Sequence, residues 1–180
     1  MEDRLPFLVI SATFLLLGII IVSVPMLQDK SETKTFTTTS NIIFRYGVSG
    51  TKHLNELNTI KGIFIKDMVN KEPVWTKLDF TQEEMDAIYE MMVKIDFFSY
   101  PTGFKPTIKS GTVVTQTPFM VYYLDFQNKS CTKRVYWNDE YINTGDAQHQ
   151  NLNQLARLIL FTIKAKPEYE KLPKPTAGYF

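Results

Sequence analysis

The residues from Leu5 to Leu27 form an unbroken apolar run, and this run constrains the chain more than any other feature. It is 23 residues long and carries no charged side chain. An α-helix rises about 1.5 Å per residue, so a helix of this length would span the hydrocarbon core of a bilayer, which is about 30 Å thick. The run therefore predicts a transmembrane helix that contacts membrane lipid, followed by a domain outside the bilayer.

The residues around this run favour an uncleaved anchor over a cleaved signal peptide. A signal peptide has a basic start, a shorter apolar stretch and small residues before the cleavage site. Here the start, Met1-Glu2-Asp3-Arg4, has one base and two acids, and the exit from Val22 to Leu27 has no Ala-x-Ala-like site. We expect residues 1–27 to be an uncleaved signal-anchor.

The charges at the two ends of the run do not settle its orientation, since Arg4 precedes it and Lys30 and Lys34 follow it. The stub before the run is short, and a large domain after it can be exported largely regardless of its charges. The single cysteine, Cys131, cannot form an internal disulfide, which argues against a disulfide-stapled secreted domain. We expect a single-pass protein of a bacterial cell membrane with its domain outside the cytoplasm.

The remainder of the chain divides into a polar stalk at residues 28–40, a globular domain at 41–166 and a proline-containing tail at 167–180, which we expect to be extended. Alternating and helical apolar patterns predict five strands and two helices in the domain. The strands are expected at 42–48, 59–69, 74–80, 112–126 and 131–137, and the helices at 81–96 and 147–165.

The order of these elements predicts an α+β fold. It comprises an N-terminal transmembrane helix and one domain, in which two helices pack on an antiparallel sheet of about five strands. The first domain helix has a capping box, Thr81-Gln82-Glu83-Glu84, in which Thr81 and Glu84 satisfy each other's backbone amides. Asp146 is the expected cap of the second helix.

The chain contains few sequence motifs that are typical of an enzyme. It has no glycine-rich phosphate loop, no zinc motif and no Gly-x-Ser-x-Gly elbow. The acidic loop at 139–146 does not match the spacing of an EF-hand, so we expect no metal and no cofactor. A formal net charge of +1 gives no indication of nucleic-acid binding.

A thiol nucleophile is the remaining catalytic candidate. Cys131 could be activated by His53 or His149, the two histidines of the chain. The simpler interpretation is a small residue in a hairpin strand and two exposed loop histidines. The sequence therefore favours a protein that is not an enzyme, with a small envelope hydrolase using Cys131 and a histidine as the alternative.

An aromatic segment and a polar loop are the candidate contact surface. Phe97, Phe98, Tyr100 and Phe104 surround Pro101, and aromatic rings beside a proline can form a platform for a sugar, a peptide or a lipid headgroup. We expect Phe97 and Phe98 to complete the core below the first domain helix, whereas Tyr100 and Phe104 could equally lie in the core or at the surface. With the loop at 138–149, this segment gives four predicted ligand- or partner-binding residues: Tyr100, Phe104, Tyr141 and His149.

Four segments after the stalk resemble a known group of proteins: Phe44-Arg45-Tyr46-Gly47, Leu57–Gly62, Leu78–Tyr89 and Pro167-Glu168-Tyr169. They are similar to uncharacterised membrane-anchored or lipoprotein-like domains of Gram-positive bacteria. The chain departs from the lipoprotein members because no cysteine follows its apolar run. The resemblance implies no activity and no catalytic residue.

These observations together predict a membrane-tethered, extracytoplasmic binding module. Its expected partners are an envelope protein or a cell-wall component, because a tether raises the local concentration of the domain near the membrane. A structural subunit of a membrane complex is a further alternative, since Gly18 with Ser11 and Ala12 offers a small-residue face for helix packing.

Overall fold

The computed structural model describes residues 40–108, 114–142 and 144–179. All of them belong to one compact unit of the chain, Phe36–Phe180. The predicted anchor, and all of the predicted stalk except Ser40, lie outside the described residues.

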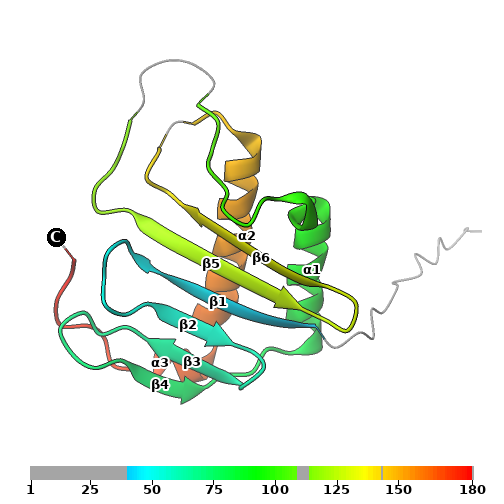
Figure 1. Ribbon diagram of the computed structural model, residues 1–180. Coiled ribbons are helices and arrows are strands. Elements are labelled where there is room, and N and C mark those ends of the chain that lie inside the picture. Colours follow the sequence, from blue (N-terminus) through cyan, green and yellow to red (C-terminus); the bar gives the residue numbers. More distant parts are fainter. Residues whose placement is uncertain (1–39, 109–113, 143, 180) are drawn as a thin grey trace, which may run out of the picture. The chain divides into compact units, whose positions relative to one another are not determined.

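A six-stranded antiparallel sheet forms the framework of this unit (Figure 1). The strands lie in the order β4-β3-β2-β1-β5-β6, so β1 is central and pairs with both β2 and β5. Their bounds are β1 (Asn41–Val48), β2 (Asn55–Asn58), β3 (Ile63–Lys66), β4 (Val74–Lys77), β5 (Met120–Gln127) and β6 (Thr132–Asn138).

Two main helices, α1 (Gln82–Lys94) and α2 (Ala147–Lys164), cover one face of the sheet and lie behind it in Figure 1. The capping box predicted for α1 is confirmed, because the Thr81 hydroxyl accepts from the Glu84 amide and the Glu84 carboxylate accepts from the Thr81 amide. The predicted cap of α2 is also confirmed: Asp146 Oδ1 accepts from the amide of Gln148 at 2.8 Å. A 3₁₀ turn, η1 (Phe97–Ser99), follows α1, and a one-turn helix, α3 (Pro167–Glu170), follows α2.

Alternation along the strands sends apolar side chains to the face that the helices cover, called here the helix face. In β1 these are Ile42, Phe44 and Tyr46, and all three are buried. Register pairs Phe44 with Leu57 of β2 and with Leu124 of β5, so the buried rows continue across the strands. The helices add their own apolar stripes, among them Ile88 and Met92 of α1 and Leu152, Leu155 and Ile159 of α2.

The opposite face of the sheet, called here the open face, is covered by no helix of the described residues (Figure 1). It carries Ile43 and Arg45 of β1 and the residues that share their register on the neighbouring strands. At the β6 edge, two backbone hydrogen bonds join Tyr136 to the segment at 102–104. Phe104 N donates to the Tyr136 carbonyl at 2.8 Å, and Tyr136 N donates to the Thr102 carbonyl at 2.7 Å.

The predicted fold class is wrong in two respects. The sheet has six strands and not about five, because Asn55–Asn58 forms β2 between the strands predicted at 42–48 and 59–69. Its sequence, Asn-Glu-Leu-Asn, has a single apolar residue and therefore no alternation. In addition, none of the described helices has the length and apolar character needed to cross a bilayer. The predicted transmembrane helix is thus not shown, and Leu5–Leu27 lie outside the described residues.

The tail also differs from the extended path predicted for it. Pro167 opens α3, where its missing amide hydrogen costs nothing. The ring of Tyr169 in this helix then packs edge-on against Phe64 of β3, with 5.4 Å between the ring centroids. The tail is therefore part of the packing at the β3 side of the sheet.

Candidate ligand-binding cavity

A cavity of about 730 Å³ lies beside the N-terminal half of α2. Its walls come from the residues after β6, from Gln116 and Tyr122 and from the polar side of α2. The volume falls in the range of small-molecule sites, about 300–1,000 Å³. Side chains of several kinds converge on this cavity, which is partly open to solvent.

Two of the predicted binding residues, Tyr141 and His149, line this cavity. His149 is 4 % exposed and is held at both ring nitrogens. Its Nε2 lies 2.8 Å from the carbonyl oxygen of Asn138, and its Nδ1 lies 3.4 Å from the hydroxyl of Thr144. A carbonyl only accepts, so Nε2 carries a proton and donates it to Asn138. His149 therefore fixes the wall formed by the β6–α2 loop.

The other two predicted binding residues, Tyr100 and Phe104, are buried in the core, at 2 % and 6 % exposure. Their rings form a chain with centroid distances of 5.4 Å between Tyr100 and Phe104 and 6.3 Å between Phe104 and His149. The Tyr100 hydroxyl donates to the carbonyl of Gln148 at 3.3 Å. The two residues support the cavity from behind, because buried aromatic rings contribute a large apolar area.

The structure does not bring the predicted Cys–His pair together. Cys131 is exposed in the turn before β6, whereas His149 contacts Asn138 at the far end of the same strand. Seven strand residues separate these ends, which corresponds to about 23 Å. His53 follows β1, whose last residue pairs with Met120 at the start of β5, again the end of the sheet away from Cys131.

Side-chain amides are the feature of the cavity that the sequence interpretation missed. Three of them lie on α2 at helical spacing, where the sequence interpretation used only the apolar stripe. This polar stripe, with a spacing of three to four residues, is the signal that could have indicated the site. The four lining amides are Gln116, Gln150, Asn153 and Gln154.

Tyr122 adds an aromatic side chain to the lining of the cavity. Its ring stacks on Trp137 with 5.2 Å between centroids, and Asn153 Oδ1 accepts from the Trp137 indole nitrogen at 3.1 Å. Burial, followed by the nearby charge of Asp139, raises the pKa of the Tyr122 hydroxyl to about 12, against the opposing effect of Arg157. The hydroxyl is therefore protonated at neutral pH.

The charges of the lining cancel. Asp139 contributes one negative charge and Arg157 one positive charge, and the described lining residues include no other acid, lysine or arginine. They also include no serine or cysteine that could act as a nucleophile. No group of three or more metal-ligating side chains occurs among the described residues. The arrangement is suited to holding an uncharged polar molecule.

Comparison with protein-family models, with curated protein sequences and with solved structures gave no match to this chain. The resemblance to membrane-anchored domains of Gram-positive bacteria therefore stays a prediction. Function has to be inferred from the site itself.

Proposed function

We propose that this protein is a binding domain held at the outer side of the cell membrane by its apolar N-terminal residues, Leu5–Leu27. In this proposal the cavity beside α2 binds an uncharged, hydroxyl-rich envelope component, such as a fragment of a glycan. The proposal depends on one observation: four side-chain amides and two tyrosines line one cavity whose charges cancel.

The chemistry of the lining matches such a ligand. A sugar hydroxyl both donates and accepts hydrogen bonds, and each side-chain amide offers two donors on nitrogen and an acceptor oxygen. The apolar C–H face of a sugar ring packs against an aromatic ring, which Tyr141 provides, because the Tyr122 ring already stacks on Phe44 and Trp137. An anionic or cationic ligand would gain little, because Asp139 and Arg157 offset each other.

Calorimetric titration of the full-length protein, in an uncharged polyoxyethylene detergent, tests the cavity. The probes are uncharged oligosaccharides and anionic oligosaccharides of the same length. Gln150→Leu combined with Gln154→Leu removes two exposed amides of α2 and should weaken binding of the uncharged sugar about 10-fold or more, since each hydrogen bond contributes roughly 1 kcal/mol. Gln148→Leu is the matched control, because this exposed residue of α2 does not line the cavity.

Three results would contradict the cavity assignment: no binding of any uncharged oligosaccharide, stronger binding of the anionic series, or equal affinity in the double variant and the wild type. Cell fractionation tests the location separately. The full chain should sediment with membranes, and a chain lacking residues 5–27 should not. A tag after Phe180 should be digested by protease in cells with an intact membrane.

A further inference from the structure

A row of six side chains crosses the whole open face, one from each strand. Every member is the register partner of the next, so neighbours are separated by one interstrand spacing, about 4.8 Å. The row has aromatic rings at both ends and two opposite charges in the middle. In order from β4 to β6 its members are Trp75, Ile65, Glu56, Arg45, Tyr123 and Tyr136.

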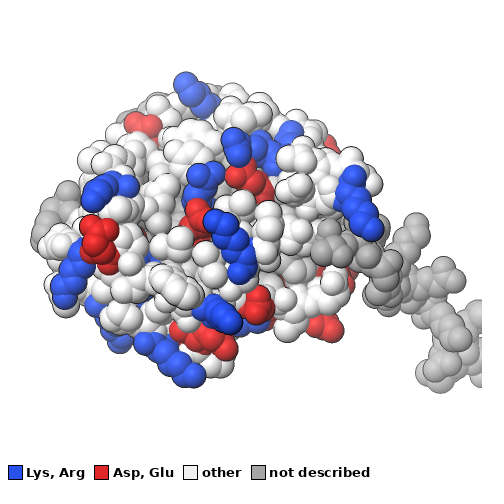
Figure 2. All heavy atoms as spheres, turned by 60° about the horizontal axis from the view of Figure 1, so that its bottom comes forward, with Lys and Arg blue, Asp and Glu red and all other residues white. Residues whose placement is uncertain are grey.

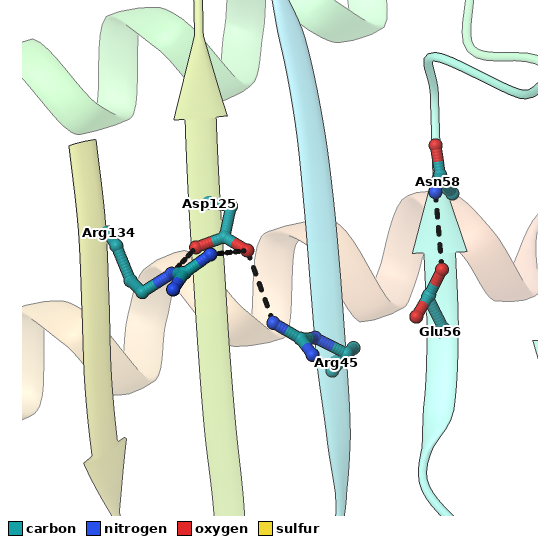
Figure 3. Close-up of polar contacts among 5 residues, drawn as sticks. All are labelled: Arg45, Glu56, Asn58, Asp125 and Arg134. Atoms are coloured by element: carbon teal, nitrogen blue, oxygen red, sulfur yellow. Dashed lines mark hydrogen bonds and ion pairs between the residues drawn. The ribbon is translucent and has the colours of Figure 1, made fainter. Parts of the chain in front are cut away.

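The two charges of this row do not pair with each other. Arg45 turns away from Glu56, and its guanidinium nitrogen lies 3.2 Å from Asp125 Oδ2 (Figure 3). Asp125 also accepts a hydrogen bond from the Arg134 guanidinium. This hydrogen bond raises the pKa of Arg134. The Arg45 guanidinium lies over the Tyr123 ring, 5.5 Å from its centroid. The Arg45 guanidinium therefore contacts Asp125 and Tyr123, in the β5–β6 half of the open face, and not Glu56.

Glu56 is left with a neutral partner. Its carboxylate accepts from the amide of Asn58 at 3.2 Å, and it takes part in none of the ion pairs of the described residues (Figure 3). Two lysines of this half of the sheet, Lys52 and Lys77, form no ion pair with Glu56. Lys52 pairs with Glu72 at 3.7 Å, and Lys77 belongs to the next row, opposite Ile63. Glu56 is therefore a partly exposed carboxylate without a basic partner.

A hollow of about 590 Å³ lies beside Glu56 on this half of the face. Trp75, which is 66 % exposed, forms one side. Leu54 lies close over Gly47, where a Cβ atom would approach its Cδ2 to 2.7 Å. The walls are apolar apart from His53 and Glu56, and they comprise Leu54, Ile63, Ile65, Pro73 and Trp75.

We propose that this hollow docks a segment of a partner protein that presents a lysine or arginine between apolar side chains. The cation meets the Glu56 carboxylate in a charge-assisted hydrogen bond and the Trp75 ring in a cation–π contact. Its apolar neighbours cover Ile63 and Ile65. Basic and acidic side chains are interspersed on the surface in Figure 2, so the attraction is local to Glu56 and not a property of a broad acidic area. This site is separate from the cavity beside α2.

Tryptophan fluorescence provides the test. The chain has two tryptophans, and Trp137 is fully buried, so a change at the surface reports on Trp75. Full-length protein in the same uncharged detergent is titrated with a short capped peptide that alternates lysine and valine. Matched peptides contain glutamate or acetyl-lysine in place of lysine. Only the lysine peptide should give a saturable change, and about 0.5 M salt should weaken its binding several-fold.

Glu56→Gln removes the charge and should weaken binding about 10-fold. Glu90→Gln is the matched control, because Glu90 is exposed on α1, on the other side of the sheet. An unchanged urea midpoint in both variants shows that they remain folded.

Four results would overturn the proposal. The first is equal binding of the glutamate peptide, and the second is equal affinity of the Glu56→Gln variant. A response to phosphocholine vesicles without a response to the lysine peptide would assign the hollow to a lipid headgroup. A change in oligomeric state of a Trp75→Ala variant, measured by light scattering, would assign it to a second copy of the chain.

Discussion

The two faces of the sheet are built from the same strands, yet they carry different kinds of residues. On the helix face, Phe44 is fully buried and its register partners Leu57 and Leu124 are equally inaccessible. One residue further along the chain, Arg45 lies on the open face between a carboxylate and a tyrosine. Strand alternation thus separates the residues that stabilise the fold from those available for recognition. Substitutions on the open face should therefore cost little stability.

The sharpest test of this difference compares neighbours in β1. Phe44→Ala removes a ring that stacks on Tyr46 at 5.4 Å, and it should lower the free energy of unfolding by about 3–5 kcal/mol. Ile43→Ala, on the half-buried open face, should lower it by only about 1 kcal/mol. Urea unfolding of both variants measures the difference. Equal losses would mean that something covers the open face in solution.

A smaller loss of stability should result when the hydrogen bond between Trp137 of the sheet and Asn153 of α2 is removed. Asn153→Ala leaves the buried Trp137 indole nitrogen without its acceptor and should cost about 1–3 kcal/mol. Gln154→Ala, at the adjacent exposed position, should stay within about 0.5 kcal/mol of the wild type. The measurement is again urea unfolding, with Trp137 emission as the probe. A loss in Gln154→Ala as large as that in Asn153→Ala would remove the role assigned to this hydrogen bond.

The smallest effect concerns alkaline pH. Burial raises the pKa of Tyr46 and, to about 12, that of Tyr122, both on the helix face. The ordinary value is 10.0, so above it the unfolded state releases a proton that the folded state retains. The free energy of unfolding should therefore fall as pH rises from about 10 to about 12.

Tyr122→Phe removes one of these hydroxyls and should make the alkaline decrease shallower. Urea unfolding on both sides of pH 10 measures it. An identical pH dependence in the variant would show that Tyr122 ionises equally in both states. The absorbance change of tyrosine ionisation provides an independent measurement of the same pKa.

Local sequence patterns predicted those elements whose structure a few neighbouring residues are enough to specify. The capping box at Thr81 and the alternation in β5 and β6 indicate their structure without any distant contact. β2 could not be found in this way. It is a strand because β1 and β3 flank it, and its four residues carry almost no preference of their own. The strand number was wrong for this reason.

The site was predictable only in part. Tyr141 and His149 do line the cavity, but the sequence could not show that Tyr100 and Phe104 would lie behind it. The sequence of a loop is the same whether its aromatic rings are exposed or fill a gap in the core, so it does not indicate which of the two occurs. The row from Trp75 to Tyr136 depends on register across all six strands, which no local pattern contains.

The central place of β1 has a consequence for the time at which the protein can fold. Arg45 and its partner Asp125 are 80 residues apart in the chain. At about 5–20 residues per second, synthesis of that interval takes roughly 4–16 s. During this interval β1 has left the ribosome without the strand that pairs along its second edge. Its apolar sequence, Asn-Ile-Ile-Phe-Arg-Tyr-Gly-Val, is then exposed to aggregation. Factors that protect nascent chains should therefore affect the yield of this protein more than its final stability.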